Sequence, residues 1–142
     1  MNPSRPTIRQ ATTHDIEGLL DLWRRSAASP SLTETPRDLG RVVDAPHAAV
    51  LVATAGGGAL VGSLIVTFDG WRGNFYRMVV DPEMRRSGLA RRLVTEAEDW
   101  LRAAGGRRST ALVEGDREIA HAFWDAMGFE HNEGMRRYSK NL

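Results

Sequence analysis

A basic turn that contains glycine holds the residues of this chain best suited to binding an anion. The turn reads Arg85-Arg86-Ser87-Gly88-Leu89-Ala90 and follows the apolar run Val79-Val80, which ends at Asp81-Pro82. Beyond the turn, apolar residues recur at helical spacing, so the pattern predicts a strand, a loop and a helix. The first N–H groups of such a helix have no internal partner, and the helix dipole is positive there. The turn therefore predicts a site for an anion, most simply a phosphate.

The elements that must position this turn can be predicted from the periodicity of the rest of the chain. Because residues 74–113 read as strand, helix and strand, they predict a βαβ unit. The run 55–58, Ala-Gly-Gly-Gly, predicts a hairpin between two strands. The expected strands are 7–11, 48–54, 59–68, 74–80 and 109–113, with a closing hairpin of 129–131 and 135–139; the expected helices are 15–25, 35–43, 89–104 and 118–127.

The composition excludes several classes of function. The chain has 142 residues, no cysteine, and 19 Lys and Arg against 18 Asp and Glu, which gives a formal net charge of +1. The lack of cysteine excludes disulfides, thiolate metal sites and a thiol nucleophile. The small net charge argues against a dedicated nucleic-acid binder, and no apolar run approaches the ~20 residues of a membrane span. We therefore expect one domain over residues 1–142, located in the cytoplasm, that binds neither nucleic acid nor membrane.

The turn and its surroundings resemble a known family. Residues 85–90 fit the R/Q-x-x-G-x-G/A acyl-CoA loop of the GNAT-type N-acetyltransferases. The preceding strand ends in Val-Asp-Pro-Glu, and residues 120–129 resemble the family's second motif, an alanine- and aromatic-containing helix that ends in Gly-Phe. The expected order of elements, β-α-α-β-β-β-α-β-α-β-β, extends the resemblance over nearly the whole chain. It implies an α/β (α+β) GNAT fold, in which a mixed, mostly antiparallel, twisted sheet of about seven strands has helices on both faces.

The resemblance implies acetyl-CoA as the co-substrate and no metal. The pyrophosphate would bind backbone N–H groups of the turn, where Gly88 permits close approach and Ala90 leaves space. The pantetheine arm would pair like an added strand with residues 78–80, and an N–H of that strand would face the oxyanion formed when an amine attacks the thioester. No covalent enzyme intermediate is required. The cofactor-binding residues expected on this basis are Met78, Val79, Val80, Arg85, Arg86, Ser87, Gly88, Leu89, Ala90 and Arg91.

Two positions depart from the family's pattern for protonating the departing thiolate. Many members place a tyrosine four residues before the glycine of the second motif, and this chain has Trp124 there; some place an asparagine seven residues earlier, where this chain has Arg117. An indole cannot donate a proton to sulfur as an acid would. The pKa of a free thiol is about 8.5, so the thiolate is already a fair leaving group. Tyr76 and Tyr138 are the alternative hydroxyl donors.

The general base is a second departure. The strand position that carries a base in some relatives corresponds here to Leu112, which cannot serve. Glu114 lies two residues further, on the same face if the strand continues, and Asp116 is the next alternative. A plain polar strand end is the competing interpretation of Glu114. Freeing a lysine-like amine at pH 7 costs about 4–5 kcal/mol and an α-amine about 1 kcal/mol, so a weak base favours the less basic acceptor.

The favoured function is acetyl transfer from acetyl-CoA to a primary amine of a small molecule, an amino acid or a peptide N-terminus. Trp124, Trp71 and Asn74 are expected to line the acceptor cleft, although Trp124 also fits a packed aromatic and the other two fit a hairpin rim. By fold analogy, the first two helices and their connecting loop would shape this cleft. The resemblance is also compatible with a homodimer. The rivals are an acyl-CoA-binding sensor or partner module without turnover and, with less support, a nucleic-acid binder that uses the arginines.

Overall fold

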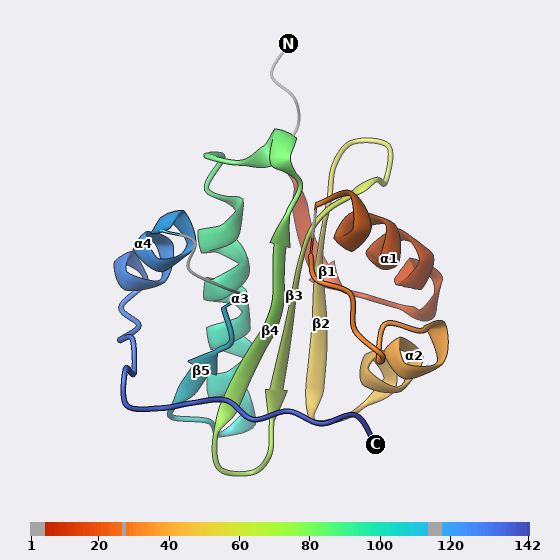
Figure 1. The fold of residues 1–142 in the computed structure, drawn as a ribbon. Helices are drawn as coiled ribbons and strands as arrows, with labels where there is room; N and C mark the ends of the chain where they lie inside the picture. Colours follow the sequence, from red (N-terminus) through yellow and green to blue (C-terminus); the bar gives the residue numbers. More distant parts are fainter. Residues whose placement is uncertain (1–4, 27, 114–117) are drawn as a thin grey trace. The chain divides into compact units, whose positions relative to one another are not determined.

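A mixed sheet with helices packed against it forms the larger part of the chain (Figure 1). The computed structural model describes residues 5–26, 28–113 and 118–142. These residues gather in two compact units, residues 1–112 and residues 113–142. The expectation of one domain over residues 1–142 stays a prediction.

The first unit contains the sheet, whose strand order is β1-β2-β3-β4-β5. The first four strands pair antiparallel, and β5 runs parallel to β4. The strands are β1 Thr7–Gln10, β2 Ala48–Thr54, β3 Leu60–Phe68, β4 Gly73–Val80 and β5 Ser109–Ala111; the helices of this unit are α1 Ile16–Arg25, α2 Pro36–Asp44 and α3 Leu89–Ala104. The parallel pair joined through α3 confirms the predicted βαβ unit.

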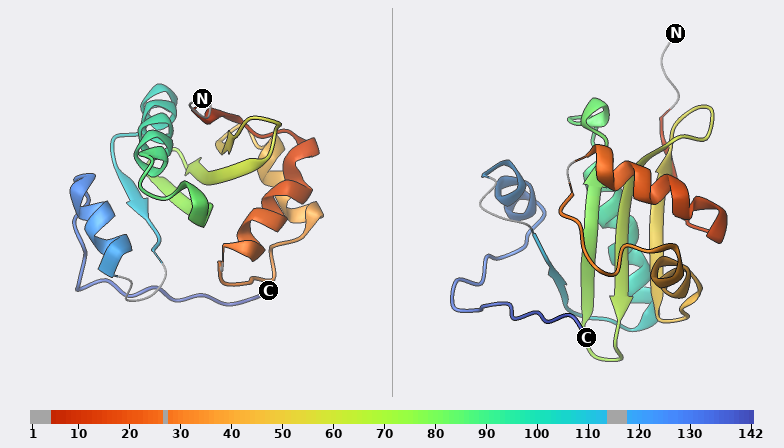
Figure 2. Two further views of the ribbon diagram at one scale, coloured as in Figure 1. Left: turned by 90° about the horizontal axis from the view of Figure 1, so that it is seen from above. Right: turned by 45° about the vertical axis from the view of Figure 1, so that its right-hand side comes forward.

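Helices cover both faces of this sheet (Figure 2). On one face, α1 and α2 bury a cluster that includes Leu19, Trp23 and Leu39 against Val50 and Val52 of β2. On the other face, α3 packs on the middle strands through Leu93, Val94 and Ala97, which are fully buried. The strands between these layers are almost wholly apolar, as expected for a sheet that is covered on both sides. This arrangement confirms the predicted fold class.

Local signals account for the helix ends. The Thr35 hydroxyl accepts a hydrogen bond from the Asp38 N–H, and Pro36 occupies the first helical position of α2. A 3₁₀ turn at Thr13–Asp15 precedes α1 and carries a capping box between Thr12 and Asp15. Within the described residues, no helix is long and apolar enough to cross a membrane.

Among the described residues the strand count is lower than expected, with five strands in place of about seven. The predicted closing hairpin is wrong, because residues 129–131 and 135–139 form no strand, and β5 ends at Ala111 and not at Val113. The segment buries little of its apolar surface: Met135 is 77% and Tyr138 91% exposed. An isolated two-stranded hairpin is marginal in water without such a face. In the second unit, α4 Glu118–Ala126 forms as predicted, one residue short.

The ion pair between Arg9 and Asp15 predicts a measurable loss of stability in acid. Arg9 donates two hydrogen bonds to the Asp15 carboxylate, at 2.7 and 2.9 Å, and these lower the pKa of Asp15 to about 2. A carboxyl whose pKa is depressed in the folded state stabilises the fold above its unfolded pKa of about 3.9, and this contribution disappears as the pH falls towards 2. Because Arg9 is 42% exposed, solvent screening limits the contribution to about 1 kcal/mol.

Replacing Asp15 with asparagine is therefore expected to remove part of the stability difference between pH 7 and pH 2.5. Urea unfolding of both proteins at several pH values measures this difference. Glu17→Gln is the matched control, because Glu17 is exposed near the same end of α1 and carries the same charge. Equal acid sensitivity of the two variants would contradict the assignment.

Candidate functional site

The turn before α3 has an unusual backbone. Asp81 accepts a hydrogen bond from the Glu83 N–H and begins a short 3₁₀ turn at Pro82–Met84. Arg86 has φ +63° and Gly88 has φ +80°, whereas Ser87 between them does not have a positive φ. These two left-handed residues turn the chain just before the first turn of α3, whose N–H groups have no partner within the helix. The sequence predicted a loop in which Gly88 permits close approach of a ligand. It did not predict the left-handed conformation of Arg86.

The loop leaves the start of α3 open to a ligand. The Ser87 hydroxyl donates to the Met84 carbonyl at 2.6 Å and lies 3.4 Å from the Leu89 N–H, so its main contact is within the loop. Gly88 occupies the N-cap position of α3 and offers no side-chain cap. No heavy atom lies within 4 Å of the place where a Cβ on Gly88 would stand. The residues present therefore fit a diphosphate at this helix end, on backbone N–H groups and in open space.

Two contacts hold this helix end beside the sheet. A Cβ on Gly62 of β3 would lie 3.1 Å from the Leu89 side chain, so the absence of a side chain lets the first turn of α3 pack closely on the strand. At the end of β4, the Asp81 carboxylate pairs with Arg25 of α1 at 3.1 Å, and Arg25 also donates to the Leu60 carbonyl at 2.6 Å. The turn is thus positioned from both faces of the sheet.

The edge of β4 opens beyond Phe75. Strand β5 pairs with β4 only at residues 73–75, and the last contact is the Leu112 N–H on the Phe75 carbonyl at 3.2 Å. Exposure increases where the pairing with β5 ends: Phe75 is 1% exposed, whereas residues 76–80 are all half-buried. Within residues 1–112, the second half of β4 therefore has a ladder partner on its β3 side alone. The predicted cofactor strand, residues 78–80, lies in this half and leads through Asp81 and the 3₁₀ turn into the loop before α3.

The predicted acid and base residues are distributed over the two units and the segment outside the described residues. Tyr76 lies on β4, where the pairing with β3 shifts register after its partner Ile65, and packs against the α1 and α2 core. Tyr138 belongs to the second unit and is almost fully exposed. Glu114, together with Asp116 and Arg117, lies outside the described residues. Trp124 sits in α4, where its ring packs edge-on against Phe123 and Phe129 at centroid distances of 5.2 and 4.9 Å.

Two residues expected in the acceptor cleft lie at the start of β4, away from the loop. Trp71 is 72% exposed in the β3–β4 turn, and its ring is covered by the Arg72 guanidinium at 3.9 Å. The backbone N–H groups of Arg72 and Trp71 donate to Asp69 and lower its pKa. Asn74 stands in register with Thr67 and Thr110. An acceptor that reaches β4 near residue 78 would be about 20 Å from Trp71, given the rise per residue of a strand.

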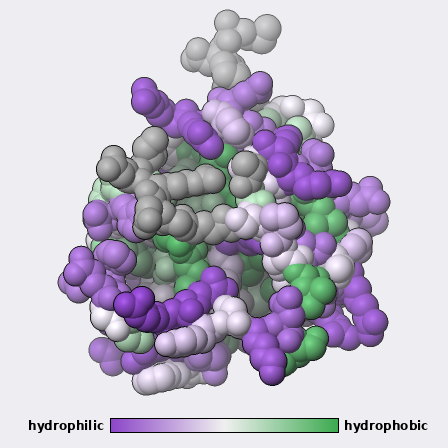
Figure 3. Space-filling model, viewed as in Figure 1, coloured by the Kyte–Doolittle hydropathy of each residue, from purple (hydrophilic) through white to green (hydrophobic). Residues whose placement is uncertain are grey.

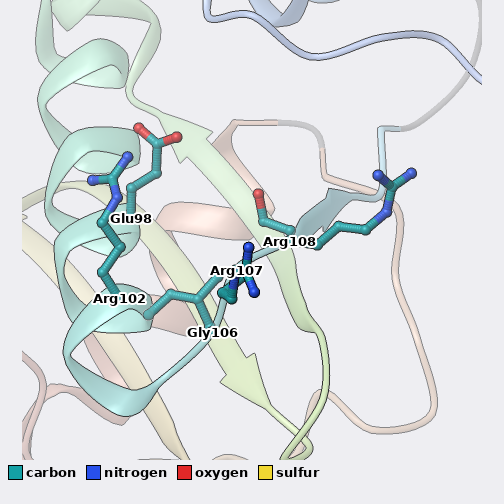
Figure 4. Close-up of a pocket in the computed structure, with 7 residues that line it drawn as sticks. Glu98, Arg102, Gly106, Arg107 and Arg108 are labelled. Atoms are coloured by element: carbon teal, nitrogen blue, oxygen red, sulfur yellow. The ribbon is translucent and has the colours of Figure 1, made fainter.

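A second hollow lies at the other end of α3 (Figure 4). Glu98 and Arg102 project from adjacent turns of the helix, and Arg107 and Arg108 follow on the way to β5. Arg102 pairs with Asp99 at 3.3 Å. This hollow is about 24 Å from the start of α3 and lies where the helix dipole is negative, which makes it the weaker anion site.

The coloured part of the face seen in Figure 3 is mainly hydrophilic. Hydrophobic side chains appear between the charged ones, and one of the exposed large residues is Leu32 of the α1–α2 loop, 60% exposed. In the part of the chain that the structure describes, no group of three or more His, Cys, Asp or Glu side chains could hold a metal ion.

Comparison with known proteins identifies the family. The profile of the acetyltransferase (GNAT) family matches residues 16–129, which is most of the 142 residues, and the chain belongs to this family. It is therefore an acetyltransferase, with acetyl-CoA as co-substrate, as the loop motif predicted. Acetyltransferase SG1711 of Sodalis glossinidius (strain morsitans) is 27% identical over 135 residues, which are 95% of this chain and 94% of that protein.

Solved structures show the same fold. The aminoglycoside N-acetyltransferase AAC(6')-Iy, in complex with the bisubstrate analog CoA-S-monomethyl-acetylneamine, has a TM-score of 0.79 at 22% identity over 98% of this chain and 100% of that one. The PaiA N-acetyltransferase from Thermoplasma acidophilum, in complex with coenzyme A, has a TM-score of 0.82 at 18% identity over 92% of each chain. At these identities the likeness concerns the fold.

Sequence reasoning missed a set of residues that surround the middle of β4. Arg77 has φ +51°, its carbonyl accepts from Ser63 on β3, and its guanidinium pairs with Glu34 of the α1–α2 loop. One signal was available: Ser63 is the only hydroxyl residue in the apolar run of residues 60–66, and a polar residue in a buried strand needs a partner.

Proposed function

We propose that this chain transfers an acetyl group from acetyl-CoA to a primary amine of a small molecule, amino acid or peptide N-terminus by direct attack of the amine. The observation that supports this most is the junction of two features on one strand. The open edge of β4 at residues 78–80 continues into a left-handed loop at the start of a 16-residue helix. Together they form a binding path for an extended arm that ends in a diphosphate.

The donor would be held mainly by backbone groups. N–H groups of residues 86–91 would bind the pyrophosphate, and the exposed side chains of Arg85, Arg86 and Arg91 would add positive charge. The pantetheine amides would pair with the free edge of Met78 to Val80. Bound there, acetyl-CoA supplies an activated acyl group as a thioester, and an N–H of this edge would stabilise negative charge on its carbonyl oxygen.

The acceptor is the less defined partner. The α1–α2 loop contacts the middle of β4 through Arg77, so the α1 and α2 side of the open edge is the proposed entrance for the amine. Two of the structural relatives are aminoglycoside N-acetyltransferases, so aminoglycosides, which carry several primary amines, belong in the acceptor class to be tested. A cytoplasmic location is part of the same proposal.

A thiol-release assay with a panel of amines tests this function. Purified protein is mixed with acetyl-CoA and amino acids, peptides with free N-termini, polyamines or aminoglycosides, and free coenzyme A is followed with a thiol reagent. Release that depends on one class of amine, with the acetylated amine found by mass spectrometry, is the expected result. Isothermal titration with acetyl-CoA alone measures donor binding in the same preparation.

An acyl-CoA-binding module without turnover is the alternative. Trp124 favours it, because the position at which the family carries an acid has a ring packed between Phe123 and Phe129. Tight acetyl-CoA binding with no thiol release on any amine would support this alternative and contradict the enzyme. Cytoplasmic location is tested separately, by fractionation of cells that express the protein.

A further inference from the structure

Arg77 stands in a left-handed conformation in the middle of β4. Its φ is +51°, and only Arg86 shares a positive φ among the non-glycine residues that the structure describes. A side chain with a Cβ avoids this conformation, so it persists only where surrounding contacts hold it. The contacts of Arg77 therefore indicate what fixes this part of the strand.

A buried hydrogen-bond chain holds the Arg77 carbonyl. Ser63 is fully buried, and its hydroxyl donates to the Arg77 carbonyl at 2.8 Å. The same hydroxyl accepts from the Trp23 indole N–H at 2.9 Å, and Trp23 is 2% exposed. A serine hydroxyl has a single proton, so accepting from the indole directs that proton to the carbonyl of Arg77.

The bulge changes which residues of β4 face the open edge. Tyr76 pairs with Ile65 and Val79 pairs with Ser63, so Arg77 and Met78 stand opposite a single residue of β3. Tyr76 and Val79 both pack on the α1 and α2 core, although they are three residues apart. A regular strand would place them on opposite faces.

Hydrogen bonds show the same change. Before the bulge, Gly73 and Phe75 bond towards β5. After it, the Asp81 N–H donates to Val61 of β3 at 2.9 Å, and strand alternation then directs the backbone groups of Met78 and Val80 away from β3. Without the bulge, Met78 would present these groups to β3.

The Arg77 side chain links this strand to the α1–α2 loop. The guanidinium donates to the Ser29 carbonyl at 2.9 Å, pairs with the Glu34 carboxylate and lies 5.2 Å from the centroid of the Trp23 ring. Both members of the ion pair are less than one-fifth exposed. The residue whose carbonyl is fixed by the buried chain thus also holds the loop at the proposed acceptor entrance.

We propose that Trp23, Ser63 and Arg77 are positioning residues, which aim the Met78 N–H at the open edge and keep the α1–α2 loop beside it. This inference rests on the proposed function for its catalytic consequence. None of the three is assigned a step in the chemistry. Loss of the chain should let the bulge relax, so that the Met78 N–H is misplaced relative to the developing oxyanion.

Ser63→Ala tests this, with Val66→Ala as the matched control. Val66 is equally buried on β3, and alternation places it on the opposite face of that strand from Ser63. Ser63→Ala should lower kcat by about tenfold or more, with the KM for acetyl-CoA changed less than about threefold. Val66→Ala should keep kcat within about twofold while losing stability. Trp23→Phe removes the indole N–H that donates to the Ser63 hydroxyl, and its kcat should lie between the kcat values of the Ser63 and Val66 variants. Equal kcat in the Ser63 and Val66 variants would overturn the proposal.

Amide hydrogen exchange separates this proposal from the proposed function. The Asp81 N–H reports the register after the bulge, and the Leu112 N–H on Phe75 reports pairing before it. Ser63→Ala should accelerate exchange at Asp81 relative to Leu112 by about tenfold, while Val66→Ala should change both alike. This result stands even if no amine is turned over. An unchanged ratio of the two exchange rates in Ser63→Ala would overturn the positioning role.

Discussion

Gly88→Ala is expected to raise the KM for acetyl-CoA by about 10- to 100-fold, because the diphosphate should lose one or two charge-assisted hydrogen bonds. Gly88 has φ +80° at the N-cap of α3, and the space where its Cβ would stand is open. In this structure a methyl group meets no protein atom, so it costs the fold only the strain of left-handed backbone, about 1 kcal/mol. The same methyl group would occupy the path of a diphosphate to the first N–H groups of the helix.

Gly57→Ala is the matched control for this experiment. Gly57 has φ +87°, again with no heavy atom near the added Cβ, and it lies in the β2–β3 hairpin. Both variants should lose similar stability in thermal unfolding, and only Gly88→Ala should weaken acetyl-CoA binding. Titration calorimetry measures this without an acceptor, so the result does not depend on finding the right amine. Equal donor affinity in the two variants would place the diphosphate elsewhere.

The strand, turn and helix that carry the proposed donor site could be predicted from the sequence because their signals are local. A proline that ends a strand, a glycine in a turn and an apolar stripe along a helix act within a few residues of one another. These signals placed the start of α3 at Leu89 and its end before Gly105, as the structure has them. The hairpin glycines at 56–58 are an equally local signal, and the strands they join are confirmed.

The bulge could not be predicted in this way because its cause is distant in the chain. The carbonyl of Arg77 accepts a hydrogen bond from Ser63, 14 residues away in the sequence. Ser63 in turn accepts one from Trp23, 40 residues away. Periodicity treated residues 74–80 as a regular strand, which would direct alternate groups to β3 throughout. The failed closing hairpin has another origin: Met135 and Tyr138 are three residues apart, so a strand over residues 135–139 would place them on opposite faces, and both are exposed.

Acceptor basicity is expected to have the largest effect on turnover. Direct attack requires a free amine, and at pH 7 an amine with a pKa near 10.4 is free about 10²–10³ times less often than one with a pKa near 7.8. For matched acceptors of equal size, kcat/KM at pH 7 should therefore favour the α-amine by about this factor. For either acceptor, kcat/KM should rise with pH until the amine's own pKa is reached. Equal kcat/KM values at pH 7 would show that the enzyme removes the proton itself.

Glu114→Gln then decides whether a carboxylate assists. If Glu114 is the base, the variant should lose about 10²-fold or more in kcat/KM at pH 7, and the loss should shrink as the pH approaches the pKa of the amine. Glu130→Gln, at an exposed position, is the control for the change of charge. A Glu114 variant that matches this control would assign the proton transfer to another group, with Asp116→Asn as the next variant. The pH dependence of the loss in kcat/KM separates two roles of Glu114. Loss of a base matters least at high pH, whereas loss of a residue that only binds the acceptor does not follow the pKa of the amine in this way.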